Sequence, residues 1–269
     1  MKIKLVSDLH LEGSSFDSSQ IAFDENGNLV DVIILAGDIS VHPELLDRHT
    51  YNIPENIPVI YVPGNHEYEC KIFNDVIPNI KKTLPFDNWY ILNNETIIIG
   101  DTRFICATLW SDLMGNGDSL YEANYEQAQL ILKTQKTFIR LDDGKKIPFG
   151  VEHMLAEFKK SKEFIIKELS SPFSGKTVVV THFAPHIQST EKKYKLSGYW
   201  ASDLSDIMDG VDIWCHGHIH STSNYHIGKT KILANPRGHS VTYNLNQNLD
   251  FQINKTFEAN PKSTKNIKI

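Results

Sequence analysis

The chain has 269 residues, of which 41% are hydrophobic, and its formal net charge is −6. This composition is ordinary for a globular protein with a sizeable core, while the negative charge argues against a surface devoted to nucleic acid, although a local basic cleft stays open. The three cysteines form no CxxC pair, which argues against a disulfide framework or a thiolate zinc site. There is no apolar leader and no run near the ~20 residues of a membrane helix, so we expect a cytoplasmic protein without membrane contact.

Strands and helices alternate in the first third of the chain. Apolar runs predict buried strands at residues 2–7, 31–36 and 57–62, with a polar loop over 8–29 after the first strand and a short helix over 41–49 after the second. This strand-helix-strand order favours parallel pairing.

Amphipathic helices are the main feature of the middle of the chain. A helical stretch at 70–85 comes first, and Leu, Ile, Ala and Phe then recur at helical spacing over 118–139 and 150–169. Residues 110–170 either pack on a sheet face or cap a site, and packing is the interpretation that we favour.

Short β-rich runs make up much of the remainder. Those at 89–92, 96–100 and 103–109 predict a hairpin or meander, so strand directions should be mixed. Strands are also predicted at 176–181, 211–215, 230–234 and 239–243. We expect one domain over 1–253, followed by a polar, weakly ordered tail over 254–269.

Five of the apolar runs end in turns that carry side chains of the kinds that bind metals. Ligands bind at the carboxyl ends of the strands in open α/β sheets, so we expect these side chains to meet at one edge. The donors, all oxygen or imidazole, are Asp8, His10, Asp38, Asn65, His182, His218 and His220. Such a mixture suits Mn, Fe, Co, Ni or Zn better than a calcium site or a cysteine zinc site. Seven donors exceed the needs of one tetrahedral ion, so we expect two divalent ions, ~3.5–4 Å apart, that share a bridging carboxylate.

The charge of such a centre favours a phosphate substrate. Two divalent ions carry four positive charges, and Asp8, Asp38 and a bridging hydroxide remove three of them. The remaining positive charge would hold a phosphoryl group while the hydroxide attacks phosphorus in line.

The motifs that carry the donors resemble those of a known family. Asp8-x-His10, Gly37-Asp38, Gly64-Asn65-His66-Glu67, His182 and Gly217-His218-Ile219-His220 are similar to the five ordered motifs of calcineurin-like metallophosphoesterases. The resemblance implies an α/β fold, namely a four-layer α-β-β-α sandwich with two mixed β-sheets and the site at the strand ends. Protein phosphatases of the family carry GDxxDRG, whereas Gly37-Asp38 continues here as Ile-Ser-Val-His. The pattern is therefore closer to the small bacterial and phage-like branch.

The resemblance also implies a role for each donor. Asp8, His10 and His220 would hold one metal, and Asn65, His182 and His218 the other, with Asp38 as the bridge. His66 would not be a ligand, and would protonate the leaving oxygen or stabilise the transition state. Manganese is the first expectation for both ions.

Other polar residues near the motifs have two interpretations each. Arg237 would pair with a substrate phosphate or form a surface salt bridge, and His186 would rim the substrate cleft or lie outside it. Glu67 would orient His66 or cap a helix. The aromatic residues Tyr68, Tyr199 and Trp200 would stack on a base, or pack in the core or rim, which we favour narrowly.

Three functions are compatible with these patterns. The leading hypothesis is a dinuclear metal-dependent phosphoesterase acting on a small phosphodiester or phosphomonoester, such as a nucleotide. The alternatives are a nuclease of the same superfamily, which the acidic balance disfavours, and a non-catalytic scaffold with the same fold. The motifs determine neither the substrate nor the oligomeric state.

Overall fold

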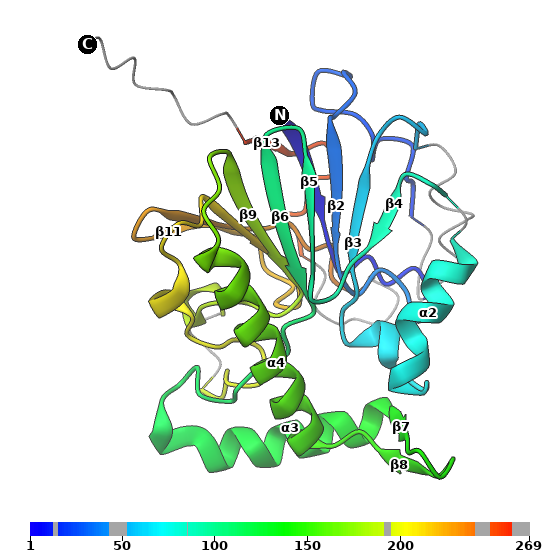
Figure 1. Cartoon of the computed structure of the whole chain (residues 1–269), viewed down its shortest axis with the longest axis vertical. Helices are drawn as coiled ribbons and strands as arrows, with labels where there is room; N and C mark the ends of the chain where they lie inside the picture. The colour runs from blue at the N-terminus through cyan, green and yellow to red at the C-terminus, as the bar shows by residue number, and fades with distance from the viewer. Residues whose placement is uncertain (13–15, 43–52, 85, 191–194, 240–247, 260–269) are drawn as a thin grey trace.

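Two β-sheets face each other across an apolar layer in the computed structural model (Figure 1). The structure describes residues 1–12, 16–42, 53–84, 86–190, 195–239 and 248–259. The first sheet contains, in order, β13 (Thr256–Glu258), β1 (Lys2–Val6), β2 (Val32–Ala36), β3 (Val59–Val62) and β4 (Trp89–Ile91). The second contains β11 (Ser223–Ile227), β12 (Thr230–Ala234), β10 (Ile213–His216), β9 (Lys176–Thr181), β6 (Thr102–Ala107) and β5 (Glu95–Ile99).

Both sheets are mixed, as predicted. Strands β1 to β4 run parallel, as do β6, β9, β10 and β12, whereas the edge strands β13, β11 and β5 are antiparallel to their neighbours. The predicted hairpin is found in β5 and β6, but β4 belongs to the other sheet, so a meander through all three strands is wrong. A helix lies between β3 and β4 in the chain and allows their parallel pairing, while only the turn Gly100-Asp101 separates β5 from β6.

The central strands are buried on both faces. In β2, Ile34 and Ala36 join the apolar layer between the sheets, while Ile33 and Leu35 join a second cluster that includes helical residues. Strands that are covered on both faces carry continuous apolar runs, which is why these strands were recognisable in the sequence.

Helices cover the sheets and one end of the molecule. α2 (Phe73–Thr83) contacts β4 and α4 (Val151–Ser170) contacts β6, which gives the expected α-β-β-α layers. α3 (Tyr121–Gln135) packs against α4 and runs across the end toward which the parallel strands point (Figure 1). The region 110–170 thus combines a helix that packs on a sheet with a helix beside the strand ends. Among the described residues, no helix has the length and apolar character to cross a membrane.

Some short strands were missed in the sequence. β7 (Phe138–Arg140) and β8 (Lys146–Pro148) form a small exposed hairpin, and β11 pairs at an edge with alternating burial. Such strands bury too little apolar surface to carry a strong hydrophobic pattern. The helix predicted over 41–49 and the strand predicted over 239–243 fall largely outside the described residues.

Part of the predicted tail is paired with the first sheet. β13 lies antiparallel to β1, and the N–H of Ala259 donates to the Met1 carbonyl at 2.9 Å. Residues 256–258 therefore form an edge strand of the first sheet, in a segment that the sequence indicated only as a polar tail. The segment is polar and without periodicity, so only its backbone pairing reveals it as a strand.

A buried lysine ties this segment to the sheet. Lys4 of β1 is fully buried, and its ammonium donates to the carbonyls of Phe23 (2.6 Å) and Ile253. Because burial disfavours the charged form, the pKa of Lys4 is lowered from 10.5 to about 8 in the folded chain.

This shift predicts a pH-dependent stability. Between pH 8 and 10.5 the unfolded chain keeps a proton on Lys4 that the folded chain has lost. The contribution of Lys4 to the free energy of unfolding should therefore rise with pH in this window, by at most ~1.4 kcal/mol per pH unit. Urea unfolding of wild type and Lys4→Met at both ends of the window isolates this contribution. A difference between the two proteins that does not change with pH would contradict it.

Candidate active site

The predicted donors lie together at one end of the two sheets. The turn after β1 carries Asp8 and His10, the turn after β2 carries Asp38, the turn after β3 carries Asn65, the turn after β9 carries His182, and the turn after β10 carries His218 and His220. These strands are parallel within each sheet, so their carboxyl ends share an edge.

Two groups of donors could each hold a metal ion. The ligand atoms of Asp8, His10 and His220 lie within 4.8 Å of one another, and so do those of Asp38, His182 and His218. Asn65 adds its side-chain oxygen to the second group, 3.1 Å from His182 Nε2. Asp38 belongs to the second of these groups, and the assignment of the donors to two ions stays a prediction.

The donor atoms of the second group would repel one another without a positive charge between them. His182 Nδ1 lies 2.9 Å from the Ala36 carbonyl, an arrangement in which Nδ1 donates and Nε2 of the neutral ring keeps its lone pair. That Nε2 atom is 3.1 Å from Asn65 Oδ1 and 3.1 Å from Asp38 Oδ2. A proton on His182 or a cation among the three atoms would resolve this repulsion.

The pKa values of the side chains in this group reflect the same demand for positive charge. Burial opposes ionisation of Asp38, but His182 and His66 hold the pKa of its carboxyl well below the ordinary value. Burial also opposes a charge on His182, yet Asp38 raises the pKa of this imidazole to about 9.

The site also contains a buried ring nitrogen without a partner. His218 Nε2 is buried and has no hydrogen-bond partner, which is costly unless a ligand is bound there. The backbone N–H of His218 donates to both carboxylate oxygens of Asp8, at 3.0 and 3.1 Å. His10 has a carboxylate behind it, because its Nδ1 lies 3.2 Å from Glu12 Oε1. Carboxylate, amide oxygen and imidazole donors in this arrangement fit borderline divalent cations.

The backbone at the site is strained. Five of the seven donors have left-handed backbone angles, with φ of 52° at Asp8, 46° at His10, 53° at Asp38, 69° at His218 and 53° at His220. Non-glycine residues in this region cost of order 1–3 kcal/mol each and cluster at functional sites. The fold therefore holds these side chains in place at the expense of stability.

Two motif glycines allow the donors to approach the backbone. A Cβ on Gly37 would lie 2.3 Å from His182 Nδ1, and a Cβ on Gly64 would lie 2.2 Å from Asp38 Oδ1. Neither space admits a side chain, so any larger residue would displace a donor.

Glu67 holds the turns that carry Asp38 and Asn65. It is fully buried and accepts a hydrogen bond from the Tyr61 hydroxyl at 2.7 Å, whereas the described residues show no hydrogen bond between the side chains of Glu67 and His66. It also accepts backbone N–H bonds from Asp38, Ile39, Ser40 and Gly64, at 2.6–3.3 Å. One carboxylate thus joins the turn after β2 to the turn after β3.

Replacing Glu67 by alanine should destabilise the fold strongly. The substitution leaves several buried N–H groups without an acceptor, and we expect the free energy of unfolding to fall by about 4 kcal/mol. Tyr61→Phe removes a single hydrogen bond of the same carboxylate and should cost about 1 kcal/mol. Denaturant unfolding measures both, and equal losses in the two variants would show that the backbone bonds contribute little.

His66 lies at the start of the 3-10 helix His66–Tyr68 and lines the cleft. Its backbone N–H donates to Asp38 Oδ1 at 2.9 Å, its Nδ1 lies 2.9 Å from Glu69 Oε2, and its Nε2 is 4.0 Å from Asp38 Oδ2. Burial opposes a charge on this ring, but Asp38 and Glu69 outweigh it and raise the pKa of His66 to about 10. The ring is therefore held by Glu69 beside the metal-type donors.

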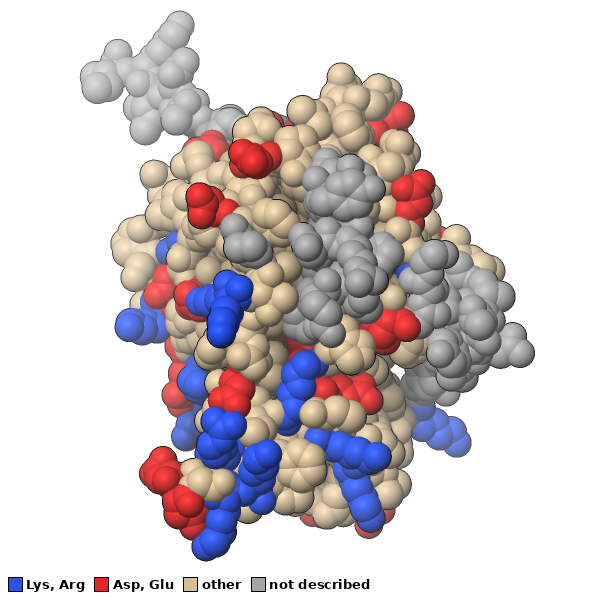
Figure 2. All heavy atoms as spheres, turned by 90° about the vertical axis from the view of Figure 1, so that its right-hand side faces the viewer, with Lys and Arg blue, Asp and Glu red and all other residues tan. Residues whose placement is uncertain are grey.

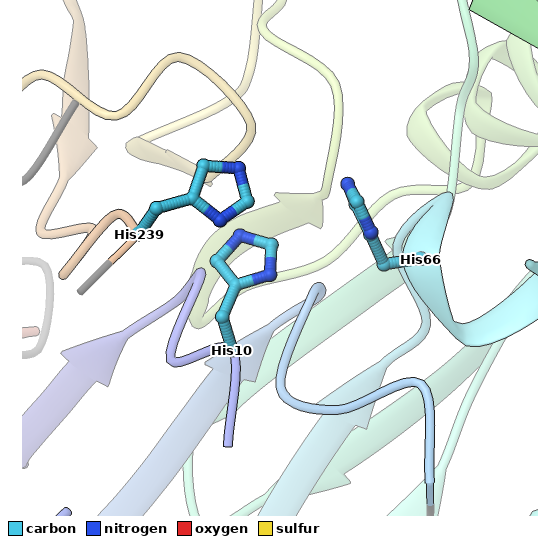
Figure 3. Close-up of side chains that lie close together, drawn as sticks. All are labelled: His10, His66 and His239. Atoms are coloured by element: carbon cyan, nitrogen blue, oxygen red, sulfur yellow. The ribbon is translucent and has the colours of Figure 1, made fainter. Parts of the chain in front are cut away.

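His239 is a site residue that the sequence interpretation missed. Its ring lies beside those of His10 and His66 (Figure 3), with centroid distances of 4.1 and 6.0 Å. The ring centroid of His220 is 4.8 Å from that of His239. His10, His66 and His239 form a third group whose ligand atoms lie within 4.8 Å of one another. The sequence did contain a clue, because His239 comes after a predicted strand and a polar turn, as the other donors do.

The turn that carries His239 is fastened to the turn after β1. The backbone N–H of Arg237 donates to the Ser7 carbonyl, and that of Gly238 to the Asp8 carbonyl, both at 3.0 Å. Arg237 itself directs Nη1 to the Leu9 carbonyl at 3.0 Å and lies over the Phe16 ring. Contact between Arg237 and a substrate phosphate stays a prediction.

A cleft of about 350 Å³ opens over the donors. The described residues that line it are Asp38, Asn65, His66, Ile131, Gln135, Thr190, Ser197, Tyr199, Trp200, His218, Ile219, His220 and His239. Tyr199 and Trp200 therefore lie at the site, whereas Tyr68 packs in the core against Phe73. His186 is not among these lining residues and accepts the Gln188 N–H, and its place at the cleft rim stays a prediction.

The sandwich and the cluster at its strand ends define a protein of the metallophosphoesterase fold. More particularly, the chain belongs to the calcineurin-like phosphoesterase family, because residues 1–222 match that family. The chain is therefore a metal-dependent phosphoesterase in class. His239 lies beyond the matched residues.

Two known proteins show how far the likeness extends. The uncharacterized protein L509 of Acanthamoeba polyphaga mimivirus is 28% identical over 262 residues, which cover 88% of this chain and 91% of that protein. The crystal structure of phosphopantetheinyl hydrolase (PptH) from Mycobacterium tuberculosis superposes with a TM-score of 0.64 and 15% identity, covering 90% of this chain and 91% of that one. The similarity to phosphopantetheinyl hydrolase is a similarity of fold.

Proposed function

We propose that the chain hydrolyses a small phosphate ester with the help of two divalent metal ions. The observation that carries this proposal is the pair of donor groups, one around His10 and one around His182, in which nitrogen and oxygen lone pairs face one another. The orphaned His218 Nε2 supports the same conclusion.

The residues that would hold the ions divide between the two groups. Asp8, His10 and His220 would bind one ion, Asn65, His182 and His218 the other, and Asp38 both. Manganese is our first candidate, and Fe, Zn, Co and Ni suit the same donors. When bound, such ions polarise phosphoryl oxygens and lower the pKa of water.

The chain's own residues supply the remaining functions. His66 lies in the cleft with its Nε2 atom 4.0 Å from Asp38 Oδ2, and so beside the position at which the metal-loaded donor groups would hold a phosphate. We assign it to donate a proton to the leaving oxygen or to stabilise charge on the phosphoryl group. Glu69, at 2.9 Å from Nδ1, would orient the ring.

A small substrate fits the cleft better than nucleic acid. Its volume of about 350 Å³ is that of a pocket for one small molecule. Lysine and arginine side chains gather on the lower part of one face, but acidic residues lie among them (Figure 2). Arg140, for example, pairs with Asp75 at 2.7 Å, and Lys145 with Asp143 at 2.8 Å. A phosphate backbone would compete with these carboxylates, so we do not favour the nuclease alternative.

The proposal is tested with the purified chain and two chromogenic esters. Manganese should allow hydrolysis of bis-p-nitrophenyl phosphate or p-nitrophenyl phosphate, and EDTA should abolish it. Turnover of the first would establish a phosphodiesterase, and turnover of the second alone a phosphomonoesterase. Manganese at 100 times its Kd should also raise the free energy of unfolding by ~2.7 kcal/mol. If no divalent ion gave either turnover or stabilisation, the proposal would fail and a scaffold function would replace it.

A further inference from the structure

The turn after β12 brings an additional histidine to the cleft. His239 lines the cleft, yet it belongs to neither of the two donor groups that contain Asp8 and Asp38. None of the five sequence motifs includes it, and it lies beyond residues 1–222, which match the family. The proposed function therefore leaves this side chain without a role.

Two buried asparagines hold the turn that carries His239. Asn235 Nδ2 donates to the Leu5 carbonyl of β1 at 2.9 Å, and Asn248 Nδ2 donates to the Pro236 carbonyl at 2.7 Å. The side chains of Asn235 and Asn248 lie in residues that are only 3% and 8% exposed. A turn that is fixed in this way spends little binding free energy on ordering when a ligand contacts it.

His239 and His66 lie on either side of His10 (Figure 3). The ring centroid of His10 is 4.1 Å from that of His239 and 4.8 Å from that of His66. One ring nitrogen from each of the three side chains lies within 4.8 Å of the other two. Two N–H groups at such a separation can both reach one oxygen atom, because each needs an N···O distance of only ~2.9 Å.

His239 differs from the other two histidines in its surroundings. The Nδ1 atoms of His10 and His66 lie beside carboxylates, 3.2 Å from Glu12 Oε1 and 2.9 Å from Glu69 Oε2. Within the part of the chain that the structure describes, neither ring nitrogen of His239 has a hydrogen-bond partner. An imidazole carries at least one N–H in either protonation state, so His239 can donate to an anionic oxygen whether or not it is charged.

We propose that His239 binds the phosphoryl group of the substrate, as a second imidazole beside His66. A phosphoryl oxygen close to His10 would lie within reach of both side chains. The N–H of His239 would hold this oxygen and stabilise the charge that develops on it during the reaction. The assignment rests on the proposed function for the identity of the ligand, but the contact with phosphate does not depend on turnover.

The first test measures binding of inorganic phosphate to the manganese-loaded chain by isothermal titration calorimetry. His239→Ala should weaken this binding about tenfold or more, because a hydrogen bond to an anion contributes that much. Manganese should raise the midpoint of thermal unfolding of the variant as much as that of wild type. Unchanged phosphate binding would overturn the proposal. Lost stabilisation by manganese would also overturn it, since His239 would then be a metal ligand.

A second set of substitutions separates hydrogen bonding from packing against His10. His239→Asn and His239→Gln keep an amide N–H at different distances from the backbone, whereas His239→Leu keeps only apolar volume. At least one amide variant should bind phosphate about tenfold more tightly than the leucine variant. His226→Ala, on the exposed position of β11, should bind like wild type. Equal losses in the leucine variant and both amide variants would show that the ring acts by packing alone.

Steady-state hydrolysis distinguishes this proposal from the proposed function. His239→Ala should lower kcat/KM about equally for phenyl phosphate and p-nitrophenyl phosphate, because the contact is to the phosphoryl group. A larger loss for phenyl phosphate would place His239 at the leaving oxygen and contradict the assignment. Phosphate binding that depends on His239, without hydrolysis of any ester, contradicts the proposed function alone. Hydrolysis that is unaffected in His239→Ala contradicts the role of His239 alone, and a chain that binds manganese but neither phosphate nor an ester contradicts both.

Discussion

Asp38→Asn is expected to abolish hydrolysis while the chain remains folded. Asp38 lies among His182, His218 and Asn65, and it is the carboxylate that both metal groups would share. The amide keeps the size of the side chain and an oxygen that can accept the His66 N–H, but it loses the negative charge. A loss of roughly 10³-fold in kcat is expected, because metal ions contribute several kcal/mol to such transition states.

Steady-state hydrolysis of a p-nitrophenyl ester with added manganese measures this effect. Asp206→Asn is the matched control, since Asp206 is 64% exposed and pairs with Lys162 away from the cleft. The control should keep wild-type activity, and both variants should unfold cooperatively. Full activity in Asp38→Asn would show that Asp38 does not bridge two metal ions.

His66→Ala should lower kcat by about 10²–10⁴-fold without weakening metal binding. His66 is absent from the two donor groups that include Asp8 and Asp38, and its ring lines the cleft. If it protonates the leaving oxygen, the loss should be larger for phenyl phosphate than for p-nitrophenyl phosphate, because the phenolate is the poorer leaving group.

Metal-dependent stabilisation is the second measurement for this variant. Manganese should raise the midpoint of thermal unfolding of His66→Ala as much as that of wild type. His226→Ala serves as the control, because His226 is exposed on β11. If His66→Ala lost metal binding, His66 would be a ligand, and the third group with His10 and His239 would become part of the metal centre (Figure 3).

The donors could be predicted because each one follows a strong local signal. Strands such as β2 and β3 are buried on both faces, so they stand out as apolar runs, and the polar residue after each run is then conspicuous. His239 has the same relation to β12, but the sequence interpretation gave weight to Arg237 in that turn. Only the packed structure shows that Arg237 binds the Leu9 carbonyl while the His239 ring lies against His10.

Residues that act through backbone contacts left no comparable signal. Glu67 is adjacent to His66 in the sequence, yet it serves the turn after β2, nearly thirty residues earlier. The partners of a carboxylate that accepts backbone N–H bonds are set by how two turns meet, and side-chain patterns do not report this. The edge strands β11 and β13 were missed for a related reason, since their pairing is carried by backbone atoms.

The sequence by itself determined the buried central strands, the order of the motifs and the chemical nature of the donors, because these follow from local hydrophobic runs and from residue type. Tertiary structure alone decided that His239 joins His10 and His66, how Glu67 joins two turns, and that α3 and the segment with Tyr199 and Trp200 line a cleft beside the site. These features depend on contacts between segments far apart in the chain, and such contacts are fixed only when the two sheets and their helices pack together.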